Sequence, residues 1–124
     1  GHNASGGVAL ALAMRDLARR QPRSLVMICG TLTTKDTRGF LAPFKDLAQE
    51  LIAVPIPGEH AGRPPQEVAD AAKAVGLVAL CASSFEEALR EIAKRSQMTT
   101  PRVLIGGSLY LAGQVLAANG TLPD

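Results

Sequence analysis

The sequence lacks most features that mark the common functional classes. Its 124 residues contain no apolar run long enough to span a membrane and no signal-peptide pattern. The net charge of +2 and the aromatic content of 3% are too low to favour phosphate contacts or base stacking with nucleic acid. No repeat or low-complexity segment is present. We therefore expect a cytoplasmic protein that binds neither membranes nor nucleic acids.

The sequence motifs of well-understood catalytic and metal sites are missing too. There is no GxxxxGK[ST] phosphate loop, no GxGxxG after a strand, no HExxH, no GxSxG and no paired Cys/His spacing. The two cysteines, Cys29 and Cys81, stand in apolar strand-like runs without a CxxC motif. This setting indicates buried free thiols in a reducing compartment. By itself the chain indicates a ligand-binding module rather than a self-sufficient enzyme.

The composition is globular, with strand and helix patterns in alternation. It is 47% hydrophobic, which suits one domain with a real core. Short apolar runs predict strands at 24–29, 50–55, 77–82 and 102–106. Helical spacing predicts helices at 5–20, 37–48, 65–75, 84–96 and 108–118, and Pro43 predicts a kink or a new first turn in the second. The alternation predicts a three-layer α/β/α, Rossmann-like fold with a mostly parallel sheet.

Polar residues mark the starts of two of these helices. Ser5 or Asn3 is placed to cap the first helix. The segment 83–87 reads Ser-Ser-Phe-Glu-Glu, which predicts a capping box in which Ser83 or Ser84 caps and a glutamate reaches back.

Loops that follow parallel strands gather at one sheet edge, where ligands bind in open α/β folds. Lys35 lies in such a loop, where it either binds a carboxylate or phosphate or is simply solvated. His60 lies in a Pro- and Gly-rich loop that fits a surface loop, a lid or an interface. Gly106 and Gly107 permit a sharp turn or a close approach, and Ser108 is placed to cap the last helix. On these three residues alone, a strand-to-helix turn without a ligand is the preferred interpretation.

Three segments together carry a family resemblance. They are Gly1-His2-Asn3 before the first helix, Gly30-Thr31-Leu32-Thr33-Thr34-Lys35-Asp36 after the first strand, and Gly106-Gly107-Ser108-Leu109-Tyr110-Leu111-Ala112-Gly113 after the last. In this order and spacing they resemble the C-terminal domain of folylpolyglutamate synthase/dihydrofolate synthase, a member of the Mur ligase family. The resemblance covers residues 1–124. It implies that the chain is one domain of a longer enzyme, and that this domain lacks the first strands of its sheet.

The resemblance also implies an activity and a set of ligands. The family joins L-glutamate to dihydropteroate or to the γ-carboxyl of tetrahydrofolate through an acyl phosphate, with ATP and Mg²⁺, in folate biosynthesis and one-carbon metabolism. The phosphate loop would lie in a missing domain of the same polypeptide. His2 would face the ATP phosphates or the incoming glutamate, Asn3 would lie near the phosphates, and Lys35 and Ser108 would bind glutamate. The chain would hold neither a complete catalytic set nor a metal site, and alone it would be inactive.

One departure, an implied strand order and two alternatives accompany this interpretation. Ala4 stands where the family usually has proline after His-Asn, and the implied strand order is 102–106, 24–29, 50–55, 77–82. With its usual neighbour missing, strand 102–106 is expected to be an exposed edge that pairs with a second copy. The alternatives are a stand-alone anion-binding or regulatory α/β module, and a peptidoglycan Mur ligase domain with another amino-acid substrate.

Overall fold

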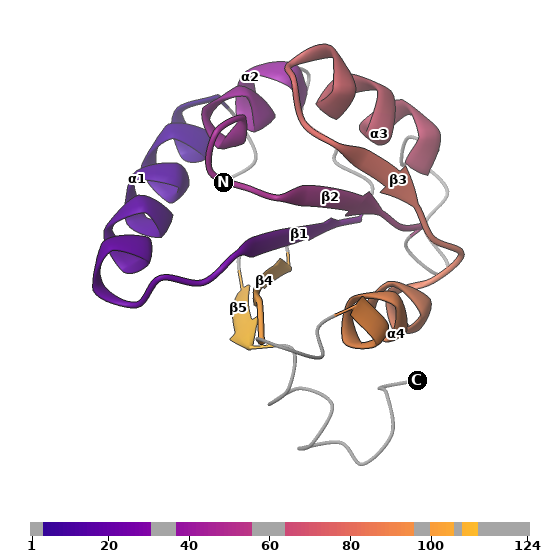
Figure 1. Cartoon of the computed structure of the whole chain (residues 1–124). Coiled ribbons are helices and arrows are strands. Elements are labelled where there is room, and N and C mark those ends of the chain that lie inside the picture. The colour runs from indigo at the N-terminus through magenta and orange to yellow at the C-terminus, as the bar shows by residue number, and fades with distance from the viewer. Residues whose placement is uncertain (1–3, 31–36, 56–63, 96–99, 106–107, 112–124) are drawn as a thin grey trace.

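The structure is a computed structural model of the chain, and it describes residues 4–30, 37–55, 64–95, 100–105 and 108–111. Strands and helices alternate along most of the chain (Figure 1). In chain order the elements are α1 (Ala4–Arg20), β1 (Leu25–Cys29), α2 (Thr37–Leu41), the 3₁₀ helix η1 (Ala42–Phe44), β2 (Glu50–Ala53), α3 (Pro65–Ala74), β3 (Ala79–Cys81), α4 (Phe85–Arg95), β4 (Arg102–Ile105) and β5 (Ser108–Leu111). None of the helices in the described ranges combines the length and the apolar character needed to cross a membrane.

The strands form a single sheet in the order β3-β2-β1-β4-β5. β1 pairs in parallel with β2 on one side and β4 on the other, and β2 pairs in parallel with β3. Only β5 is antiparallel. The mostly parallel α/β fold is therefore confirmed, and so is the predicted order of its four parallel strands.

Helices cover both faces of the sheet, which makes three layers. Every residue of β1 is buried, as expected for a strand covered on two sides. Met27 belongs to the core cluster beneath α1, α2 and α3, whereas Ile28 belongs to the cluster beneath α4. Figure 1 shows the same division, with α1, α2 and α3 on one side of the sheet and α4 on the other.

Two hydrogen bonds from arginine side chains to backbone carbonyls hold the amino edge of the sheet together. The side chain of Arg102, only 3% exposed, donates from Nη2 to the carbonyl of Gln21 just beyond α1, at 3.0 Å. Arg23 donates from Nη1 to the carbonyl of Thr100 at 2.8 Å. Cations near a helix C-terminus satisfy carbonyls that have no partner within the helix. These bonds join the end of α1 to the start of β4.

Several predicted boundaries were too long. The helix expected over 37–48 divides into α2 and η1, with Pro43 at the start of the second turn, as one of the two predicted outcomes. The third strand is shorter than predicted, at Ala79–Cys81. α1 already begins at Ala4, so Ser5 lies inside the helix and is not its cap. Asn3, the other candidate cap, lies outside the described residues.

The helix predicted from Ser108 is wrong over its described part. Residues Ser108–Leu111 form β5, which pairs antiparallel with β4 from Ile105↔Ser108 to Arg102↔Leu111. Only two residues connect the paired strands, and Gly-Gly in that position favours a β-hairpin. The expected exposed edge at 102–106 is wrong for the same reason, because β5 covers it. The basis for a strand-paired dimer at β4 is thereby removed.

The two cysteines also differ from each other. Cys29 is buried as predicted, but Cys81 is exposed. Cys81 lies in β3, which is an edge strand, and its Sγ donates weakly to Oε1 of Gln66 at 3.7 Å. An edge strand has a neighbour on one side only, so its last residue is poorly covered.

Candidate functional site

The strand order reverses direction at the junction between β1 and β4. From β1 the chain proceeds through β2 to β3 and then returns to place β4 on the opposite side of β1. The register Ile28↔Ile105 brings the carboxyl ends of the two central strands together. In open α/β sheets, a crevice that binds ligands forms at such a reversal.

The starts of α1 and α2 lie together near this edge because their backbones touch. A Cβ built on Gly7 would overlap the carbonyl oxygen of Phe40 and would lie 2.9 Å from its Cα. Only a residue without Cβ permits this approach. α1 begins three residues before Gly7, at Ala4, and α2 begins three residues before Phe40, at Thr37. The first turns of both helices therefore lie in one region.

The residues implied as ligand-binding stand next to these elements in the sequence. His2 and Asn3 directly precede α1, and Lys35 lies two residues before α2, but all three lie outside the described residues. Ser108 is the first residue of β5 and pairs with Ile105, the last residue of β4. Its backbone thus lies at the carboxyl edge as expected, although in a strand rather than at a helix cap. The contacts among the four side chains stay a prediction.

The start of α4 at the same edge is closed by the protein's own carboxylate. Ser84 Oγ accepts the Glu87 backbone N–H at 3.0 Å, and Glu87 Oε1 accepts the Ser83 backbone N–H at 2.9 Å. Glu87 Oε2 also accepts the Ser83 hydroxyl at 2.8 Å. The backbone bond from Ser83, followed by the hydroxyl bond, lowers the pKa of the Glu87 carboxyl. The predicted capping box is confirmed, with Ser84 as the cap.

The remaining polar chemistry at the described edge is sparse. Burial raises the pKa of the Cys29 thiol to about 12, so this residue at the end of β1 stays protonated and is a poor nucleophile. Within the described ranges, no three His, Cys, Asp or Glu side chains lie close enough together to hold a metal ion. The described edge therefore supplies a scaffold and backbone groups, and three of the four candidate residues, His2, Asn3 and Lys35, lie outside the described residues.

Sequence reasoning missed two residues that shape this region. Gly7 was not singled out, although a Gly6-Gly7 pair inside a helical pattern is a recognised signal of close packing. Thr37, at the first position of α2, was not singled out either, although its side chain is buried, with an exposed fraction of 3%. No sequence signal distinguishes Thr37 from the other threonines of the preceding loop.

Fold and edge together define a class. An open, mostly parallel sheet covered on both faces, with its reversal point between two central strands, is a doubly wound α/β fold, and folds of this class bind their ligands at the reversal point. The sequence matches no protein-family profile and no curated protein.

A comparison with solved structures does find proteins of similar fold. A folylpolyglutamate synthase from Thermotoga maritima superimposes with a TM-score of 0.62 and 20% identity, over 99% of this chain and 27% of its own. A folylpolyglutamate synthase from Mycobacterium tuberculosis, solved in complexes with ADP and AMPPCP, gives 0.63 and 23%, over 100% of this chain and 29% of its own. The chain therefore has the fold of one part of these enzymes, and it spans less than a third of their length.

Proposed function

We propose that residues 1–124 are the C-terminal, glutamate-binding domain of a cytoplasmic, ATP-dependent folate ligase. The whole enzyme would add L-glutamate to dihydropteroate, to the γ-carboxyl of tetrahydrofolate, or to both, through an acyl phosphate. One combined observation carries the proposal. The fold matches folylpolyglutamate synthases along the whole chain, and in the sequence each of the three motif segments is next to an element that begins or ends at the carboxyl edge of the sheet.

The chain's own part in this reaction is to hold and orient the amino acid. L-Glutamate presents two carboxylates and one amine. Lys35 supplies a positive charge for one carboxylate, and Ser108 supplies a hydroxyl or a backbone N–H beside it. Held in this way, the amine is aimed at the activated carboxyl group, which replaces a bimolecular encounter by a positioned attack. His2 and Asn3, at the start of α1, donate toward phosphate oxygens.

Nucleotide and metal belong mainly to another part of the enzyme in this proposal. The described residues offer no cluster that fits Mg²⁺, and the sequence has no phosphate loop. Glu87 already fills the anion position at the start of α4. We therefore assign the phosphate loop, Mg²⁺ and most ATP contacts to a domain of the same polypeptide outside this chain, and we expect the isolated chain to be inactive.

A titration of the chain with L-glutamate tests the binding step. Backbone amide NMR shifts should change at residues 30–36 and 106–108, and D-glutamate should produce smaller changes. Lys35→Met should abolish the shifts, whereas Lys73→Met, which removes an exposed lysine of α3, should leave them intact. Shifts confined to other regions would refute the assignment of the site.

An activity assay of the complete gene product tests the reaction. ATP, L-glutamate and either dihydropteroate or tetrahydrofolate should give ADP, phosphate and a product heavier by one glutamyl residue. ATP-dependent ligation of another amino acid to a peptidoglycan precursor instead would favour the peptidoglycan ligase alternative. Anion binding without any ligation would favour the stand-alone regulatory module.

A further inference from the structure

An open groove lies along the second half of α1. It is lined by Leu12, Arg15, Ala18 and Arg19 of α1 and by Leu47 beyond η1, and its volume is about 470 Å³. We call it the α1 groove. α1 ends where the chain enters β1, at the amino edge of the sheet, so the groove lies away from the carboxyl edge that carries the candidate ligand site. What it binds is therefore independent of the proposed function.

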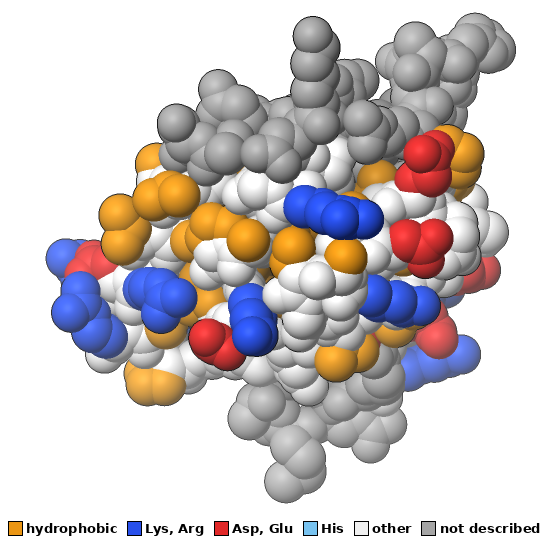
Figure 2. Space-filling model, turned by 90° about the horizontal axis from the view of Figure 1, so that it is seen from above, with side chains coloured by type: hydrophobic (Ala, Val, Ile, Leu, Met, Phe, Trp, Pro, Cys, Tyr) orange, Lys and Arg blue, Asp and Glu red, His pale blue; other side chains and the backbone are white. Residues whose placement is uncertain are grey.

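The floor and approach of the α1 groove are apolar and exposed. Leu12 is 62% exposed, and Val8, one turn earlier, is 50% exposed. Within the described ranges only one other large hydrophobic side chain, Val78, is as exposed. Single exposed hydrophobic residues are normal, but Val8 and Leu12 share one helix face beside a hollow. Figure 2 shows hydrophobic side chains interspersed with Lys and Arg over this helical layer.

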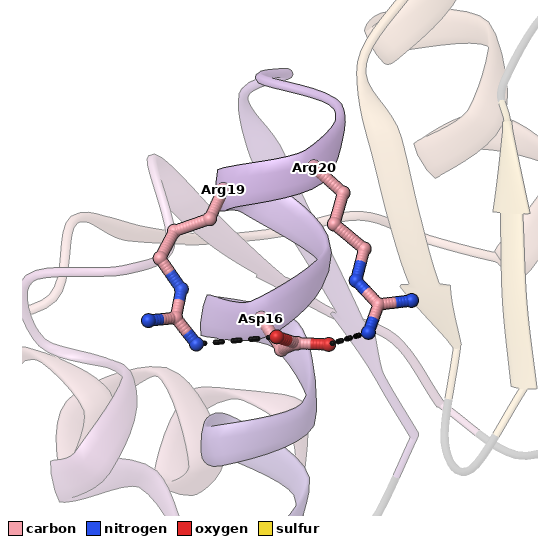
Figure 3. Close-up of polar contacts among 3 residues, drawn as sticks. All are labelled: Asp16, Arg19 and Arg20. Carbon is pink, nitrogen blue, oxygen red and sulfur yellow. Dashed lines mark hydrogen bonds and ion pairs between the residues drawn. The ribbon is translucent and has the colours of Figure 1, made fainter.

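The charge along the groove is positive and incompletely balanced. Arg15 and Arg19 stand four residues apart on the face that carries Leu12, an arrangement of like charges that disfavours a helix. Asp16 pairs with Nη2 of Arg19 at 3.1 Å and with Nη2 of Arg20 at 3.2 Å (Figure 3). No carboxylate among the described residues pairs with Arg15. An external anion beside Arg15 and Arg19 would relieve their repulsion.

We propose that the α1 groove binds an acidic amphipathic helix of a partner protein. The stripe from Val8 to Arg19 is about 16 Å long at 1.5 Å per residue, which matches three turns of a second helix. Apolar side chains of that helix would lie against Leu12 and Leu47, and carboxylates one turn apart would meet the two guanidinium groups. A small anion would leave the apolar floor uncovered. A flat bilayer surface would not fill the hollow.

Peptide binding tests the proposal directly. The probe is a fluorescein-labelled, hydrocarbon-stapled helix of about twelve residues, with leucines at i, i+3, i+4 and i+7 and glutamates beside them. A matched probe carries lysine in place of each glutamate. In fluorescence anisotropy the acidic probe should bind the full chain at micromolar concentration, and the lysine probe should not. Affinity should fall as salt is raised, because ion pairs at the rim are screened.

Three variants locate the binding surface. Arg15→Glu and Leu12→Ser should each weaken binding of the acidic probe at least about tenfold, which corresponds to 1.4 kcal/mol. Both positions are exposed, and a carboxylate four residues before Arg19 favours the helix, so folding should be kept and is checked by circular dichroism. Arg90→Glu, at an exposed position of α4, should leave affinity unchanged.

Four results would overturn the proposal. The first is no change in anisotropy at millimolar protein, the second is equal binding of both probes, and the third is an affinity that Arg15→Glu does not change. The fourth is that the acidic probe does not bind, while the chain binds phosphatidylserine vesicles in a way that depends on Arg15 and Leu12. The last result would assign the surface to membranes.

Discussion

Replacing Gly7 by alanine should destabilise the protein, against the ordinary preference of a helix for alanine. An added Cβ would lie 2.9 Å from Cα and 3.0 Å from the carbonyl carbon of Phe40, and it would overlap the carbonyl oxygen. Since unstrained contacts begin at about 3.4 Å, α1 and α2 would have to separate by at least about half an ångström. The obstacle is backbone, so no side-chain rotation relieves it.

The expected magnitude follows from two opposing contributions. Overpacking costs about 1–3 kcal/mol, and a backbone clash belongs in the upper part of that range. Alanine gains up to about 1 kcal/mol over glycine inside a helix. The net loss should be about 1–2 kcal/mol, which lowers Tm by roughly 4–8 °C for a chain of this size.

Thermal and urea unfolding followed by circular dichroism measure this loss. The matched control is Ala9→Gly, at an exposed position of the same helix, which should lose about 1 kcal/mol from helix propensity alone. Amide shifts of Thr37–Leu41 should move in Gly7→Ala and not in the control. A rise in Tm for Gly7→Ala would refute the argument that the two helix starts are held together by this contact.

Perturbations at four further residues have definite outcomes. Gly76, at φ +95°, donates its N–H to the Lys73 carbonyl and ends α3 in a left-handed turn. In urea unfolding, Gly76→Ala should therefore lose about 1–2 kcal/mol of stability, and Gly76→Asn clearly less. Equal losses for the two variants would contradict this explanation. Burial raises the pKa of Cys29, so above pH 9 the thiol ionises first in the unfolded chain, and the stability of the fold falls as pH rises toward 12. In unfolding measured as a function of pH, Cys29→Ala should flatten this fall. Cys81→Ala, which removes an exposed thiol, should not. Ser84→Ala should cost about 1 kcal/mol through its lost cap. The lowered pKa of Glu87 adds stability that is present above the ordinary pKa of a glutamate and is lost as pH falls through the lowered value, and unfolding of Glu87→Gln in acid should lack this slope.

Much of the fold could be predicted because its signals are local. The run 25–29 is apolar throughout, which allows only a strand buried on both faces, and the serines and glutamates at 83–87 define a helix start. The segment at Ser108 satisfies two patterns at once. A serine after two glycines suits a helix cap, but Gly-Gly between two short apolar runs equally suits a hairpin. Pairing with β4 decided between them, and no local signal reports that pairing.

For the candidate site, the sequence could predict only which edge of the sheet the loops follow, and not the contacts between their side chains. The parallel pairing of β1 and β4 brings the ends of these strands to one edge, whatever side chains follow them in the sequence. The contact of Gly7 with Phe40 depends on how two helices approach each other, and a sequence pattern does not give that distance. The exposure of Cys81 depends on β3 lying at the end of the strand order, which the local apolar pattern around it does not reveal.

The reversal of strand order between β1 and β4 also has a consequence for folding kinetics. The Arg23–Thr100 bond beside this junction joins residues 77 positions apart, whereas the Val26↔Glu50 pair of β1 and β2 closes a far shorter loop. Closing the longer loop costs about 1 kcal/mol more in chain entropy. We expect β1, β2 and β3 to assemble before β4 joins them. The carboxyl edge at this junction is then completed in the last step of folding, and a ligand bound there would slow the first step of unfolding.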